Sequence, residues 1–166
     1  MGPATIFIRS AVVLAGAAIP AAAHLAAAPL AHADNARLNN GVVANVYTIQ
    51  HQAGCTNNVA VFPPLRLAAQ WHTLDVLNNP TLDGDIGSDG STPQSRALAA
   101  GFHGNVAETV AINPSLAINN IDILNQWYYN PQDLAIMQDC QYTQMGVWSE
   151  NSLSRSVVVA VYGHPA

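Results

Sequence analysis

The chain has 166 residues, two cysteines and a formal net charge of −5, and only 9% of its residues are charged. From Asp34 onward, ten acids face only four permanently charged cations, which are Arg37, Arg66, Arg96 and Arg155. Such a surface repels phosphate groups, so the composition argues against nucleic acid and anionic membranes as partners.

The beginning of the chain has the pattern of a cleaved export signal. An alanine-rich apolar run covers residues 11–31 and closes with the small-x-small sequence Ala31-His32-Ala33. A membrane anchor is the alternative interpretation, but Pro20 and Pro29 interrupt the run near its middle and its end. We therefore expect residues 1–33 to be a signal peptide that is removed on export.

The remaining residues, 34–166, have the length of one ordinary domain with one core. No later apolar stretch is long enough to cross a bilayer, so we expect no membrane span after cleavage of the signal. The sequence thus predicts a secreted, single-domain protein.

Two helices are predicted in the first part of this domain. Apolar residues recur at helical spacing over residues 38–52, and Gly54 follows as a C-terminal signal. A second helix begins at Pro63-Pro64, because proline is tolerated in a first turn, and ends at Asn78-Asn79-Pro80. Its apolar face carries Leu65, Ala68, Ala69, His72 and Val76. A histidine in such a setting is usually a packed, hydrogen-bonded structural residue, and we interpret His72 in this way.

A long loop over residues 80–93 follows, rich in Gly, Asp and Ser. Its segment 83–90 has some acids of a calcium loop but lacks the third regular acidic position and the closing glutamate, so a plain turn is favoured. Ser91 or Thr92 then caps a short helix from Pro93 to about Ala100.

Residues 104–112 are expected to be extended or irregular, and Asn113-Pro114-Ser115 opens an amphipathic helix that runs to Trp127. A second, short helix opens at Asn130-Pro131. Residues 140–148 and 155–163 are predicted strands, and the short loop between them predicts an antiparallel hairpin. Helices followed by a hairpin indicate an α+β fold in which helices cover an antiparallel sheet.

The two cysteines, Cys55 and Cys140, lie far apart in the sequence. In an exported chain such a pair most simply forms one disulfide, which closes a long loop. The alternative, a nucleophilic thiol, needs a nearby base and a reducing environment. The disulfide is the interpretation we adopt.

Four motifs in order resemble the CAP superfamily, the fold of cysteine-rich secretory and pathogenesis-related proteins, in its exported bacterial form. Residues 65–73 match the family's L-x-x-A-A-x-x-H-S, and residues 89–102 match its D-G-S-T-P-x-x-R-x-x-x-A-G-Y. Residues 107–111 match its G-E-N-I-A, and residues 142–147 match Y-T-E-I-G-V at the expected distance from Trp127. The resemblance covers nearly all of residues 38–163 and implies a three-layer α-β-α sandwich.

The resemblance also implies a cleft built from two histidines and two acids, which in some members bind a divalent metal. Only one of these four positions is unchanged, namely the acid Glu108. The second acid is replaced by Gln144, and one histidine is replaced by Asp133. The other histidine falls on Asp85, or on Gly84 if the loop alignment shifts by one residue.

This substituted site argues against zinc, which prefers imidazole and thiolate ligands. Calcium or magnesium would need Asp85, Glu108 and Asp133 to converge, with Gln144 as a carbonyl donor. The simpler interpretation leaves Asp85 and Asp133 solvated and Glu108 buried, held by backbone amides and Gln144. We therefore expect no cofactor.

The chemistry-bearing residues do not indicate an enzyme strongly. No G-x-S-x-G elbow marks a nucleophilic serine. We expect a non-catalytic binding module for a small ligand, a lipid or an extracellular protein, and the alternative is a carboxylate- or cation-dependent hydrolase that uses Glu108 and Asp133. A lipid would need a groove along the stripe from Ala117 to Trp127 with Tyr128 and Tyr129, unless these residues simply form the core.

Overall fold

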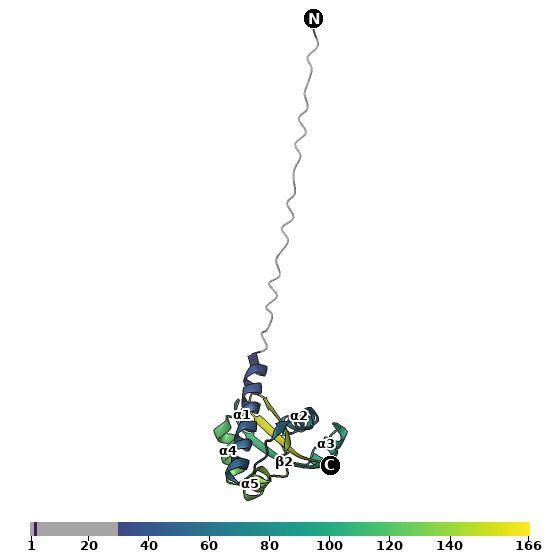
Figure 1. Ribbon diagram of the computed structural model, residues 1–166. Helices are drawn as coiled ribbons and strands as arrows, with labels where there is room; N and C mark the ends of the chain where they lie inside the picture. Colours follow the sequence, from purple (N-terminus) through teal and green to yellow (C-terminus); the bar gives the residue numbers. More distant parts are fainter. Residues whose placement is uncertain (1, 3–29) are drawn as a thin grey trace.

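The computed structural model describes residue 2 and residues 30–166. Residues 30–166 form three layers, with one sheet between two layers of helices (Figure 1). One face of the sheet is covered by α1 (Leu30–Gln52), α4 (Asn120–Tyr128) and α5 (Pro131–Gln138). The other face is covered by α2 (Pro63–Asn78) and α3 (Pro93–Ala99). The strands are β1 (Ala60–Val61), β2 (Gly104–Asn113), β3 (Gln144–Asn151) and β4 (Ser156–Pro165). This confirms the predicted α-β-α sandwich.

The predicted signal peptide, residues 1–33, lies almost entirely outside the described residues. Helix α1 begins at Leu30, just before the predicted cleavage site, and covers the helix expected over residues 38–52. Within residues 30–166, no helix combines the length and the apolar character that a membrane span requires.

The strand order is β1-β3-β4-β2, and the three long strands are antiparallel, with β3 and β4 forming the predicted hairpin. The sheet differs from a purely antiparallel one because the two residues of β1 pair in parallel with β3. The chain reaches this edge just before Pro63 starts α2, which explains why the parallel pairing is so short.

Strand β4 is buried on both faces, which explains its nearly continuous apolar sequence. Its residues alternate between the two halves of the core, because successive side chains of a strand point to opposite faces. Val157, Val159 and Val161 pack with α2 and α3. Val158, Ala160 and Tyr162 pack with α1, α4 and α5.

One expected element is more regular than predicted, and another begins later. Residues 104–113 form a regular strand, with every residue paired to β4. The helix expected from Asn113 to Trp127 begins only at Asn120, because Asn113 still belongs to β2 and Asn119 caps the helix. The Asn119 side chain accepts hydrogen bonds from the backbone of Ile121 and Asp122.

Helix α2 lies directly against β3, and Gly146 makes this close approach feasible. A Cβ atom at this position would collide with the backbone of Leu65 and Arg66. The glycine of the Y-T-x-x-G motif is therefore explained by packing of the helix on the sheet.

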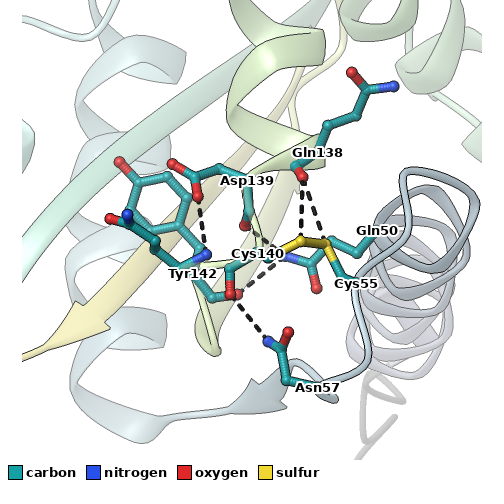
Figure 2. Close-up of a disulfide and its surroundings, with 8 residues drawn as sticks. Gln50, Cys55, Asn57, Gln138, Asp139, Cys140 and Tyr142 are labelled. Atoms are coloured by element: carbon teal, nitrogen blue, oxygen red, sulfur yellow. Dashed lines mark hydrogen bonds between the residues drawn. A yellow bond between two sulfur atoms is a disulfide. The ribbon is translucent and has the colours of Figure 1, made fainter.

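The predicted disulfide between Cys55 and Cys140 is present and joins the segment just after α1 to the turn before β3 (Figure 2). Beside it, the fully buried side chain of Gln50 donates hydrogen bonds to the carbonyl oxygens of Asp139 and Tyr142, at 3.2 and 3.0 Å. Asn57 donates to the Cys140 carbonyl oxygen at 3.1 Å. The turn before β3 is thus fixed to α1 by one covalent and several polar contacts.

Candidate functional site

Glu108 lies on β2, opposite Val161 of β4, and its side chain is completely buried on the face covered by α2 and α3. Nη2 of Arg96 donates a hydrogen bond to its Oε1 at 2.9 Å. The second carboxylate oxygen, Oε2, is buried and has no hydrogen-bond partner within the protein. One half of the carboxylate is therefore paired, and the other half is unpaired.

Helix α3 and the loop before it place Arg96. Thr92 caps the helix by accepting from the backbone N–H of Ser95, and Arg96 follows in the last turn of this short helix. The Arg96 guanidinium also donates to the backbone oxygens of Ser91 and Asp85, at 2.8 and 2.7 Å. Arg96 thus connects the long loop to Glu108.

His72 of α2 is the third member of this buried cluster. Its Nε2 lies 2.9 Å from the Gly84 carbonyl oxygen and 3.4 Å from Oε1 of Glu108. Burial lowers the pKa of His72, opposed by the hydrogen bond to Gly84. Since a carbonyl oxygen can only accept, a neutral His72 carries its proton on Nε2.

Burial also raises the pKa of Glu108 to about 8, because loss of hydration outweighs the attraction and the hydrogen bond of Arg96. The negative charge of Asp85 raises it further. Near neutral pH the carboxyl group therefore holds a proton in much of the population. The expectation that backbone amides and Gln144 hold Glu108 is wrong, since Arg96 and His72 surround it.

An open cavity of about 310 Å³ lies over Glu108, and we call it the acidic cleft. It contains three of the four positions carried over from the CAP resemblance, Asp85, Glu108 and Asp133, together with Gly84. Gln144 does not line it. The full lining is Asp83, Gly84, Asp85, Glu108, Val110, Asn130, Gln132, Asp133 and Ile136.

The residues of the acidic cleft do not fit a divalent metal. Among residues 30–166, no group of three His, Cys, Asp or Glu side chains comes close enough to hold an ion. The Arg96 guanidinium already contacts Glu108 and repels a further cation from that oxygen. Asp85, Glu108 and Asp133 thus line one cavity without converging on one point.

The fold agrees with that of known extracellular proteins. An outer surface protein from Borrelia burgdorferi superposes with a TM-score of 0.64 at 14% identity, covering 75% of this chain and 90% of the other. An extracellular protein containing an SCP domain from Bacillus anthracis gives 0.63 at 15% identity, covering 82% of this chain and 45% of the other. The chain has the SCP fold. A cysteine-rich secretory protein from Staphylococcus aureus gives 0.59 at 9% identity, covering 78% of this chain and 39% of the other.

At the level of sequence, no family model and no curated protein matches the chain. The SCP fold confirms the resemblance to the cysteine-rich secretory proteins as far as architecture is concerned, because identities this low carry only the fold. The chain spans less than half of the second and third of these proteins.

The groove considered for a lipid is only partly apolar in this SCP fold. Trp127 is 1% exposed and belongs to the core, whereas Tyr128 and Tyr129 are 44% and 78% exposed. The two tyrosines border a cavity of about 300 Å³ between α1 and α4. Four of its eight lining residues are polar, namely Asn45, Thr48, Gln52 and Asn125. The other four are Ile49, Leu124, Tyr128 and Tyr129, so the lining is mixed.

Arg96 is the site residue whose role the sequence did not indicate. It was matched only as part of the D-G-S-T-P-x-x-R motif. A usable signal existed, because a buried strand acid needs a counter-charge and the domain contains only four arginines. The loop 83–90 forms turns, with Asp89 accepting from the Ser91 backbone, and shows no calcium-loop arrangement among the described residues.

Proposed function

We propose that this chain is an extracellular, non-catalytic binding module whose acidic cleft holds a positively charged organic group, on a small molecule or on a protein side chain. The observation that supports this most is that four acids line one cavity, namely Glu108 with its unpaired Oε2 and three aspartates. The extracellular setting is supported by the named proteins that share the fold.

The charges in the cleft favour a cation. Asp83 and Asp85 are exposed at its mouth, and Asp133 is partly buried on its wall. Arg96 pairs with Glu108 at the floor, so the charges of the three aspartates remain available. The carboxylates are spread over the cavity, so a single metal ion cannot contact all of them. An ammonium or guanidinium group can instead donate several hydrogen bonds to them.

The same lining is poorly equipped for hydrolysis. Within the described part of the chain, the cleft contains no serine, cysteine or histidine to act as a nucleophile or an imidazole base. Oε1 of Glu108 is occupied by Arg96. A binding role therefore uses more of the observed features than a catalytic role does.

The proposal is tested by titrating the 15N-labelled domain with n-butylamine and, as a neutral isostere, with n-butanol. We expect saturable shifts at Gln132, Asp133 and Gly84 with the amine only. Asp133→Asn should weaken binding, whereas Glu150→Gln, which removes the same charge outside the cleft, should have little effect. Equal shifts with butanol, or no shifts with either compound, contradict the proposal.

A carboxylate-dependent hydrolase is the second candidate function. It is favoured by one observation, because Glu108 and Asp133 line the same cavity and burial raises the pKa of both. Hydrolysis of p-nitrophenyl acetate and p-nitrophenyl glycosides by wild type and Glu108→Gln separates the two functions. A rate that falls by at least about 100-fold in the variant supports catalysis, and equal background rates support binding alone.

A further inference from the structure

A second cavity, of about 440 Å³, lies between α2, α3 and the loop that joins them, and shares no lining residue with the acidic cleft. We call it the α2–α3 cavity. His72 and Arg96 belong to its lining, and neither of them lines the acidic cleft. The exposed indole of Trp71 borders the same cavity.

His72, which lines the α2–α3 cavity, has an unused acceptor. Its Nε2–H is committed to the Gly84 carbonyl oxygen, so Nδ1 carries a free lone pair. The side chain is fully buried, and Nδ1 has no hydrogen-bond partner within the protein.

Arg96, which lines the same cavity, has an unused donor. Its two terminal nitrogens are bound to Ser91, Asp85 and Glu108, but Nε–H has no acceptor. The residue is only 5% exposed. A buried polar atom left without a partner costs about 1–3 kcal/mol, so a ligand that supplies both partners gains from this arrangement.

A ligand that satisfies both atoms must donate to one and accept from the other. A hydroxyl group does both. The carboxylates of Asp75 and Asp89 repel an anionic ligand, and the match to a hydroxyl group favours a neutral one. Asp75 is itself already bound to Ser88.

The size and the aromatic border indicate more than water. A water molecule occupies about 30 Å³ in the liquid, far less than this cavity. Trp71 is 40% exposed, so its flat apolar face is available to the C–H face of a ring. We propose that the α2–α3 cavity binds a neutral sugar, whose ring stacks on Trp71 and whose hydroxyl groups pair with Nδ1 of His72 and Nε of Arg96.

The test uses the 15N-labelled domain titrated with glucose, galactose, mannose and N-acetylglucosamine. At least one sugar should shift the Trp71 indole and the His72 Nδ1 resonances with the same saturation curve. Trp71→Ala should weaken this binding about tenfold, equivalent to about 1.4 kcal/mol. Trp71→Phe should retain part of the affinity. Tyr129→Ala, which changes the cavity between α1 and α4, should leave the affinity unchanged.

The outcome does not depend on the acidic cleft, since n-butylamine should neither compete with the sugar nor shift the Trp71 indole. The proposal is overturned if no sugar, added up to its solubility limit, shifts both resonances. In that case only water pairs with Nδ1 of His72 and Nε of Arg96. It is also overturned if Trp71→Ala binds as tightly as wild type. The wild-type spectra decide the question even if a variant fails to fold.

Discussion

Nη2 of Arg96 lies 2.9 Å from Oε1 of Glu108, and both side chains are buried between the sheet and the layer of α2 and α3. This pair ties the long loop after α2 to strand β2, and His72 closes the cluster at 3.4 Å. Glu108 lines the acidic cleft, whereas Arg96 and His72 line the α2–α3 cavity. Several properties of the protein should therefore depend on Arg96 and Glu108.

Arg96→Ala should destabilise the domain by about 1–3 kcal/mol, because it leaves Oε1 of the buried Glu108 and the backbone oxygens of Ser91 and Asp85 without their donor. The loss is measured by urea unfolding. In a double-mutant cycle, Arg96→Ala combined with Glu108→Gln should cost clearly less than the sum of the single changes. Additive costs would show that the two groups are not coupled.

The stability of the domain should fall as pH rises between about pH 6.5 and 8. The folded pKa of Glu108, about 8, lies above its ordinary value of 4.5, so the folded state binds more protons than the unfolded state in this window. The slope approaches about 1.4 kcal/mol per pH unit. His72 contributes an opposite slope only near pH 6.5, because burial lowers its pKa in the folded state while the unfolded imidazole still binds protons there.

Glu108→Gln is the matched control for this pH dependence. The variant cannot ionise at this position, so its free energy of unfolding should be nearly flat over the same window. Urea unfolding of both proteins at several pH values makes the comparison. An equal slope in the two proteins would assign the proton to another group.

Removal of the disulfide by Cys55→Ala with Cys140→Ala should destabilise the domain by about 4 kcal/mol in the chain-entropy model. The bond spans 85 residues, and the loop it closes contains α2, α3, β2, α4 and α5. Gln50 and Asn57 still hold the turn before β3, so we expect the fold to persist. The measurement is urea unfolding, and a change below about 1 kcal/mol would contradict the expectation.

Gly146→Ala should destabilise the domain by about 1–3 kcal/mol, because the new methyl group collides with the backbone of α2. Gly84→Ala is a suitable comparison, since its Cβ position is open and its φ is not in the left-handed region. Thermal unfolding of both variants tests this. Similar melting temperatures would contradict the close packing of α2 on β3.

The sequence predicted the elements whose signals are local. Pro63 and Thr92 mark helix starts, and the β-branched run of β4 marks a buried strand. The late start of α4 is not predicted from the sequence, because Asn113 and Asn119 are both good helix caps. Only the pairing of Asn113 with Ser156 of β4 decides between them. The resemblance placed Asp85, Glu108 and Asp133 in one cleft, but it could not show that Arg96 fills the space beside Glu108. That contact depends on side-chain direction across three separate segments.

The most direct test of the proposed binding role is the affinity for n-butylamine, measured calorimetrically between about pH 7 and 9, where the amine remains charged. Ionisation of Glu108 adds a negative charge to the floor of the cleft. The affinity should therefore rise as pH passes through about 8, and Glu108→Gln should remove this rise. An affinity that is undetectable throughout, or that does not change with pH and is the same in the variant, would contradict the account.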